Sequence, residues 1–287
     1  MFSGKRPDGT VVRKAPRVRL FMPYLIPRRS DAVVFYEQKM DISKTLDYLE
    51  RWNASDDRPP LRFFHIYLAA IVRMLHERPR VNRFIAGRRL YQRDDVAVAM
   101  SVIKQYEDNS KTTVVKQVYP SGLGLRGVYD LTEAVIGTGR DKTRKTASEK
   151  EVSVISRLPR AMIPLFPKLQ KLGDWLNITP ASLSRNDPLY ASFMISNLGS
   201  IGIDAAYHHL YEHGTLPIFA VIGKANDEAV VTERREIEIR PIVNVRYTFD
   251  ERVADGYYAA RSLDLISDLV ENPWLLETES DDGPGVL

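Results

Sequence analysis

The segment Tyr247-Thr-Phe-Asp-Glu-Arg-Val-Ala-Asp-Gly256 lies where one hydrophobic period gives way to another. Before it, from Ile237 to Phe249, apolar side chains fall mainly on odd positions, as in a strand with one buried face. Pro241 predicts a bulge or an edge position in that strand. Beyond Gly256 the apolar residues follow helical spacing, and Asn272-Pro273 predicts the end of the helix. The segment is therefore a strand-to-helix junction.

Two carboxylates stand at this junction. If the strand alternation continues, Glu251 falls on the apolar face, and Asp255 lies where the helix N-cap is expected. A carboxylate on an apolar face loses water, which raises its pKa. Spacing alone favours the simpler interpretation, in which Asp255 is a cap and Glu251 lies at the rim of a turn.

The remaining sequence predicts a mixed α/β domain. Residues 1–16 are expected to form a flexible basic arm, 17–276 the domain, and 277–287 an acidic tail, with 139–190 as a variable insertion. The apolar and β-branched patterns predict strands at 32–42, 97–104, 112–119, 193–195, 217–223 and 237–249, and helices at 44–52, 61–77 and beyond 256. The string Gly122-Leu-Gly124-Leu-Arg-Gly127 resembles a dinucleotide fingerprint. Because Tyr129-Asp130 is expected to delay the next helix, a glycine-rich turn is favoured.

Composition narrows the function classes. The chain has 287 residues, 44% of them hydrophobic, which is enough to bury a sizeable core. It contains no cysteine, which excludes disulfides, thiolate metal sites and a cysteine nucleophile. No apolar run is long enough for a membrane span, so a cytoplasmic protein without stable membrane insertion is expected. The net charge of +4 comes without any nucleic-acid recognition motif, so no nucleic-acid partner is expected.

Four motifs together resemble one enzyme family. They are Pro79-Arg-Val-Asn82, Phe193-Met-Ile-Ser-Asn-Leu-Gly199, Ile218-Phe-Ala-Val-Ile-Gly223 and Phe249-Asp-Glu-Arg-Val-Ala-Asp-Gly256. This set, in this order, is similar to the catalytic domain of 2-oxoacid dehydrogenase dihydrolipoamide acyltransferases and to chloramphenicol acetyltransferase. The resemblance implies an α/β fold with a large mixed sheet, assembled as a homotrimer with active sites at the subunit interfaces. It also departs from the family, in which a histidine stands at the position of Glu251.

The resemblance assigns roles to individual residues. Ser196 matches the hydroxyl that hydrogen-bonds the oxyanion of the tetrahedral intermediate, and Asn197 beside it is expected to contact substrate. Asp255 matches a carboxylate that pairs with an N-terminal arginine, for which Arg19 is the preferred candidate; Arg17 and Arg28 are the alternatives. Glu251 occupies the position of the general base. The substrate implied is acyl-coenzyme A, with no metal and no bound lipoyl group.

Glutamate is a weak replacement for histidine as a base. A model glutamic acid has a pKa of about 4.3 and a thiol about 8.5, so the proton transfer is uphill by roughly 5–6 kcal/mol. Three possibilities follow: a tuned Glu251, another base, or no catalysis. His208 and His209 follow Ser196 in the sequence, and one hypothesis is that either of them reaches the site; surface or packing histidines are the simpler interpretation. A metal site built from His208, Glu212 and His213 lacks a fourth ligand.

Two functions are therefore carried forward. The first is a CoA-dependent acyltransferase that acts on an unknown small-molecule acceptor or a separate carrier, and the alternative is a catalytically inactive homologue that binds a ligand or serves as a trimeric scaffold. The apolar stretch within 157–184 has no match in the family. It predicts extra core or interface, a lid or channel wall, a trimer contact or a surface that touches a membrane.

Overall fold

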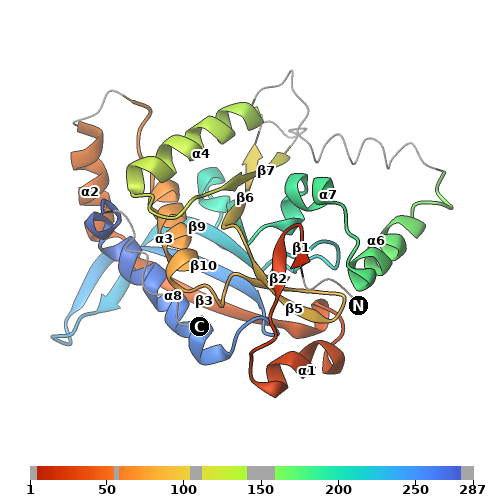
Figure 1. The fold of residues 1–287 in the computed structure, drawn as a ribbon. Coiled ribbons are helices and arrows are strands. Elements are labelled where there is room, and N and C mark those ends of the chain that lie inside the picture. Colours follow the sequence, from red (N-terminus) through yellow and green to blue (C-terminus); the bar gives the residue numbers. More distant parts are fainter. Residues whose placement is uncertain (1–4, 55–57, 104–111, 141–158, 279–287) are drawn as a thin grey trace.

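The computed structural model describes residues 5–54, 58–103, 112–140 and 159–278. Its centre is a six-stranded mixed sheet in the order β3-β10-β9-β8-β6-β7 (Figure 1). The strands are β3 Val33–Asp41, β6 Ala97–Ile103, β7 Thr112–Val118, β8 Phe193–Asn197, β9 Ile218–Val231 and β10 Ile237–Asp250. β8 lies parallel to both β6 and β9, and the other neighbours are antiparallel. The mixed α/β sheet predicted from the sequence is confirmed.

The alternation predicted for the junction strand is not seen in the burial of β10. Ile237 and Ile239 are 75% and 69% exposed, and beyond Pro241 both faces of the strand are covered, so that Asn244 and Thr248 are buried as well. The register of β10 against β9 shifts between Val243 and Val245. The bulge was expected at Pro241, and it lies further along the strand. Pro241 has no N–H, and it stands just outside the β3 ladder, where its carbonyl accepts a hydrogen bond from the Ile42 N–H (3.0 Å). The edge position was therefore predicted correctly and the bulge was not.

Helices cover one face of the sheet. They are α2 Ser43–Ala54, α3 Phe63–Glu77, α4 Leu125–Arg140 and α8 Gly256–Glu271. α3 is apolar on almost every side, and ten of its residues are buried. It packs between the sheet and its neighbours α4 and α8, in the largest core cluster. α4 begins directly after the glycine-rich turn and includes Tyr129 and Asp130, so the delay expected there is wrong, although the turn itself, with Gly122 at φ +79°, is confirmed.

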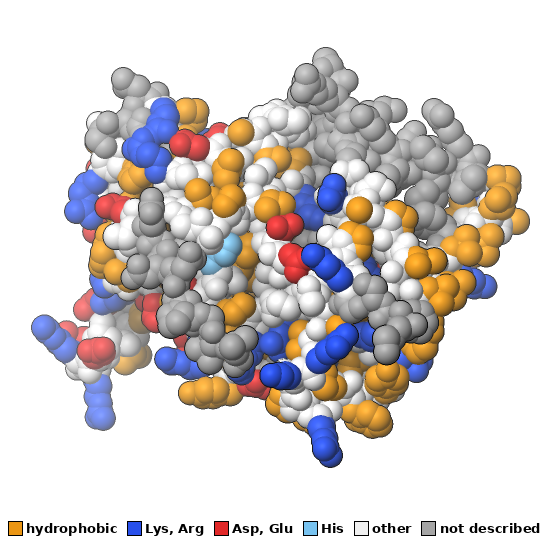
Figure 2. All heavy atoms as spheres, viewed as in Figure 1, with side chains coloured by type: hydrophobic (Ala, Val, Ile, Leu, Met, Phe, Trp, Pro, Cys, Tyr) orange, Lys and Arg blue, Asp and Glu red, His pale blue; other side chains and the backbone are white. Residues whose placement is uncertain are grey.

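The insertion contributes short helices at the periphery. α6 Leu165–Leu176 and α7 Ala181–Asn186 precede the 3-10 turn η2 Pro188–Tyr190, while residues 141–158 lie outside the described residues. α6 stands at the right-hand margin of the molecule, where hydrophobic side chains gather on the surface (Figure 2). The described part of the chain contains no helix long and apolar enough to cross a membrane.

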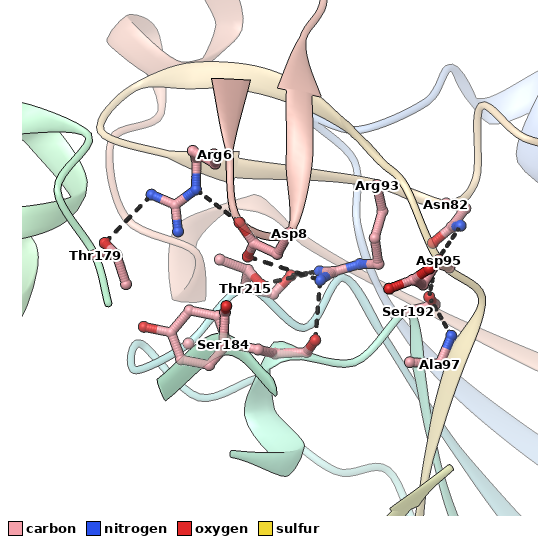
Figure 3. Close-up of polar contacts among 12 residues, drawn as sticks. Arg6, Asp8, Asn82, Arg93, Asp95, Ala97, Thr179, Ser184, Ser192 and Thr215 are labelled. Atoms are coloured by element: carbon pink, nitrogen blue, oxygen red, sulfur yellow. Dashed lines mark hydrogen bonds and ion pairs between the residues drawn. The ribbon is translucent and has the colours of Figure 1, made fainter. Parts of the chain in front are cut away.

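The N-terminal segment is not a flexible arm where the structure describes it. Residues 5–11 form β1 Lys5–Arg6 and β2 Gly9–Val11, which join β5 Arg89–Arg93 and β4 Arg83–Ala86 in a second sheet. Arg6 is only 2% exposed, and its guanidinium donates to Asp8 (2.9 Å), toward which Arg93 also points (Figure 3). Buried cations need such partners, and these attach the segment to the domain. The helix α1 Arg17–Leu25 and the turn η1 Ser30–Ala32 follow.

Candidate active site

Ser196 lies at the end of β8 in the larger of the two pockets that we describe, with a volume of about 400 Å³. Its hydroxyl is half-buried and makes no hydrogen bond with any residue that the structure describes. The pocket is also lined by residues from β6, α4, η3 and the start of α3, including Arg62, His65, Ser101, Glu133, Asn197 and Ser200. A free hydroxyl donor that faces a polar pocket is suited to binding a carbonyl oxygen or an oxyanion.

Two glycines of the motifs hold this serine in place through close backbone contact. A Cβ on Gly199 would lie 2.4 Å from the Gly223 carbonyl oxygen, and a Cβ on Gly223 would lie 2.3 Å from the Asp204 carboxylate. No side chain fits in either gap, so η3 Leu198–Ile201 folds directly against β9. Asn197 accepts a hydrogen bond from the Ser200 N–H (3.2 Å), which caps this turn. Asn197 lines the pocket as expected, and its amide oxygen is engaged in the cap.

His65 and Glu133 form a hydrogen-bonded pair in the wall of the same pocket. The Nδ1 atom of His65 accepts from the Arg62 N–H (3.0 Å), so its Nε2–H donates to Glu133 Oε1 (3.0 Å). Burial lowers the pKa of His65, although the hydrogen bond with Glu133 acts in the opposite direction. Both ring nitrogens are therefore occupied, and the residue caps α3 as a neutral imidazole. No sequence signal identified this pair, because its members are 68 residues apart.

Glu251 lies at a second pocket of about 210 Å³, lined mainly by apolar side chains of β3, β10, α1 and α8. Its side chain is half-buried, and it forms no ion pair with the residues described. The other charged residue at this pocket is Arg19, which donates to the backbone carbonyl of Glu251. Val81, from the first of the four motifs, also lines it.

A buried ion pair fixes the turn that carries Glu251. Asp250 is 1% exposed and accepts two hydrogen bonds from the guanidinium of Arg252, at 2.8 and 2.7 Å. Arg29 lies 3.7 Å from the same carboxylate and donates to the Gly214 carbonyl (2.8 Å). Burial lowers the pKa of Arg29, and the charge of Asp250 opposes this effect. Sequence reasoning missed this arrangement; the Asp-x-Arg spacing in the motif was the available signal.

The expected pair between Asp255 and Arg19 is not present. Asp255 is exposed, and its carboxylate accepts from the Tyr258 N–H (2.8 Å) as the N-cap of α8. Arg28, one alternative partner, instead pairs with Asp31 (2.8 Å). Arg19 reaches only the backbone carbonyl of Glu251, and the N-terminal arginine that lies beside a carboxylate of the motif is Arg29, because the β3 ladder places residues just before Val33 beside Asp250.

His208 and His209 line neither pocket. The ring of His208 stacks on Phe219 at 4.2 Å, on the face of the sheet opposite α3, and its Nδ1 lies 2.8 Å from the His209 carbonyl oxygen. His213 pairs with Asp187 (2.5 Å). Within one chain neither His208 nor His209 lies at the Ser196 or the Glu251 pocket, and their place at a substrate site stays a prediction. The described residues contain no group of His, Asp or Glu side chains that could hold a metal ion.

The pockets of Ser196 and Glu251 share no lining residue. Ser196 on β8 and Arg246 on β10 both pair with Val221 on β9, so they lie at the same height in the sheet with one strand between them. Glu251 follows Arg246 by five residues. Regular sheet spacing then places Ser196 and Glu251 about 19 Å apart. α3 separates the pockets, since His65 lines one and Met74 the other, a rise of about 14 Å along the helix. One chain therefore carries the two groups on separate surfaces.

Comparison with known proteins identifies the fold. Residues 179–278, which include Ser196, Glu251 and Asp255, match the family model described as 2-oxoacid dehydrogenases acyltransferase (catalytic domain). A probable dihydrolipoamide acetyltransferase from Listeria monocytogenes superimposes with a TM-score of 0.59 at 14% identity, covering 91% of this chain and 95% of the other. No curated protein sequence matches the chain.

Two further solved structures have the same fold. The dihydrolipoamide acetyltransferase of Azotobacter vinelandii superimposes with a TM-score of 0.58 at 18% identity, covering 92% of this chain and 93% of the other. A chloramphenicol acetyltransferase gives 0.51 at 13% identity, with 92% and 98% covered. The resemblance to the acyltransferase family and the chloramphenicol acetyltransferase-like fold, both predicted from the motifs, are thus confirmed.

Proposed function

We propose that this protein is an acyltransferase that takes an acyl group from coenzyme A. The observation that carries the proposal is the hydroxyl of Ser196, which has no hydrogen-bond partner among the described residues and lines a pocket of about 400 Å³. The Azotobacter relative supports it, because a serine, a histidine and an asparagine have been investigated there for roles in the catalytic mechanism. That histidine and asparagine are four residues apart, as Glu251 and Asp255 are in this chain.

The chemistry assigned to the site is a single acyl transfer. The acceptor thiol or hydroxyl attacks the thioester carbonyl while a base removes its proton. The resulting oxyanion accepts a hydrogen bond from Ser196, an interaction of a kind often worth about 3 kcal/mol. Collapse of the intermediate breaks the carbon–sulfur bond and releases coenzyme A, whose thiolate takes up a proton. The acceptor is a small molecule or a separate carrier.

Glu251 is the base in this proposal, and it acts from a neighbouring copy of the chain. Because the two pockets do not meet within one chain, an assembly that places the Glu251 pocket of one copy against the Ser196 pocket of the next would complete the site. A closed homotrimer satisfies this head-to-tail requirement. The unpaired carboxylate of Glu251, in a largely apolar pocket, is available for a proton.

The test is thiol release from a panel of acyl-CoAs, with and without dihydrolipoamide. We expect Ser196→Ala to lower the rate about 10²–10³-fold and Glu251→Gln to abolish it, while Glu236→Gln, in the exposed β9–β10 turn, leaves it unchanged. A Glu251→Gln variant as active as the wild type would remove Glu251 from the mechanism.

The second candidate function, a catalytically silent homologue, is favoured by the carboxylate at the base position. Glu251→His distinguishes the two. An inert wild type that gains turnover on this substitution would mean that the site is intact but lacks its base. Turnover that is present in the wild type and lost in Glu251→Gln supports the enzyme.

A further inference from the structure

α6 presents its apolar side to solvent and its polar side to the protein. Gln170 and Asp174 face inward, where Gln170 donates to the Tyr190 hydroxyl and Asp174 accepts from Arg6 at 2.9 Å. Gly87 packs against the α6 backbone so closely that a Cβ there would lie 2.5 Å from the Asp174 carbonyl oxygen. An ordinary surface helix has the reverse orientation. The contacts that hold α6 therefore fix its leucines outward.

Four leucines form a stripe along the exposed side of α6. They are Leu165, Leu169, Leu172 and Leu176, each 37–56% exposed, at helical spacings of three and four residues. Ile178, just beyond the helix, is 68% exposed and extends the stripe. Figure 2 shows hydrophobic side chains together at this margin of the molecule. A contiguous apolar stripe on such a helix indicates a docking surface rather than scattered exposure.

Cations border this stripe. Lys168 and Lys171 project from α6 on one flank, and the guanidinium groups of Arg88 and Arg89 lie 6.0 and 5.8 Å from the ring of Trp175. Glu212 is 3.9 Å from Lys171, but both side chains are well exposed, so the pair is weak. Asp174, the single acidic residue of α6, is turned inward to Arg6. The outward surface is therefore apolar and basic.

We propose that α6 is an interfacial helix that binds an anionic membrane surface. Outward leucines, a partly exposed tryptophan and flanking lysines are the arrangement with which a helix lies along the headgroups without spanning the bilayer. A second copy of the chain fits less well. The lysines that flank two such stripes would repel each other if the stripes packed together.

Vesicle flotation with the full chain tests this surface. Vesicles of phosphatidylcholine alone are compared with vesicles that contain phosphatidylglycerol, using the wild type, the double variant Leu169→Glu/Leu172→Glu and Lys168→Glu/Lys171→Glu. The matched control is Leu46→Glu on α2, whose leucine is 44% exposed. Thermal unfolding of each variant verifies that the fold is retained, because all these side chains are exposed.

We expect the wild type and Leu46→Glu to float with anionic vesicles and both double variants to bind them about tenfold more weakly or worse. Added salt should weaken wild-type binding, because the lysine contribution is screened. Equal binding by the wild type and Leu169→Glu/Leu172→Glu, or no binding to anionic vesicles, would overturn the proposal. It would also be overturned if the leucine variant changed only the oligomeric mass in solution, which would assign the stripe to a second copy.

Discussion

The Ser196 pocket and the Glu251 pocket are built in different ways from one sheet. The first lies at the end of β8, is lined by serines, Asn197 and the His65–Glu133 pair, and has a volume of about 400 Å³. The second lies beside β3 and β10, is mainly apolar, has a volume of about 210 Å³, and has Arg19 and Glu251 as its charged members. A polar pocket can orient a thioester, and an apolar pocket can desolvate a base. In the proposed function these two pockets are half-sites that require each other.

The largest effect is expected from the ion pair behind the Glu251 half-site. Asp250→Asn removes the charge that both Arg252 and Arg29 face, while the shape of the side chain is preserved. Leaving buried guanidinium groups uncompensated should lower the free energy of unfolding by about 3–5 kcal/mol in urea titrations. The Ser196 pocket does not include this turn. In hydrogen-exchange measurements, the backbone amides of that pocket should therefore lose protection only because the whole protein unfolds more readily, and not through local opening.

Asp255→Asn is the matched control for that experiment. It removes the same charge four residues later, but asparagine is as good an N-cap as aspartate, so stability should change by less than about 0.5 kcal/mol. If Asp255→Asn were as destabilising as Asp250→Asn, then Asp255 would carry the structural ion pair that the family resemblance implied.

Mixing the two inactive variants tests whether the half-sites combine between chains. Ser196→Ala and Glu251→Gln are unfolded together in equal amounts and refolded, and thiol release is measured against each variant refolded alone. If each site takes one residue from each of two neighbouring copies, about a quarter of the sites in a random mixture are intact. Activity should therefore return to about a quarter of the wild-type value. No recovery would mean that both residues act within one chain.

How much the sequence predicts differs between these regions. At the β10–α8 junction the strand, the amphipathic helix and the Asp255 cap could be predicted from the sequence, but the alternation did not predict which side chains of β10 are buried, because both faces of the strand are covered beyond Pro241. The N-terminal strands could not be predicted, because what orders residues 5–11 is the pairing of Arg6 and Asp8 with Arg93 and Asp174. Such distant polar pairs leave no period in the sequence.

The candidate site shows the same division. Gly199 and Gly223 lie where close backbone contact requires glycine, and Ser196 lines a pocket, so the motifs located the pocket to which the proposed function assigns the oxyanion. Arg19 was predicted to pair with Asp255 but donates to the Glu251 carbonyl instead, and sequence distance could not identify Arg29, which the β3 ladder places beside Asp250. The outward stripe of α6 was visible as apolar sequence, but its orientation depends on inward contacts of Gln170 and Asp174.

A smaller effect is expected from the helix cap beside Glu251. Asp255→Ala leaves the Tyr258 N–H without its side-chain acceptor and should cost about 1 kcal/mol of unfolding free energy. The cap begins α8 directly after the turn that carries Glu251. The rate of thiol release should therefore fall by more than the smaller folded fraction of the protein explains. Comparison with Asp255→Asn isolates the cap, because that variant removes the charge and retains the acceptor. Equal losses in both variants would show that the charge of Asp255, not its capping, matters.

The smallest effect is a pH dependence that belongs to the Ser196 half-site. Burial lowers the pKa of His65 below its ordinary value of 6.5. At a pH between the folded and the unfolded pKa, His65 therefore binds a proton in the unfolded chain and not in the folded chain. The stability contributed by neutral His65 is complete above pH 6.5 and is lost as the pH falls through its folded pKa, by at most about 1.4 kcal/mol per pH unit. Urea titrations at pH 7 and pH 5.5 should therefore show a shallower loss for His65→Gln than for the wild type, whereas His209→Gln, at an exposed position, should match the wild type. Identical slopes for the wild type and His65→Gln would mean that the pKa of His65 does not change on folding, and a smaller loss in the wild type than in His65→Gln would mean that His65 is protonated in the folded protein and paired with Glu133.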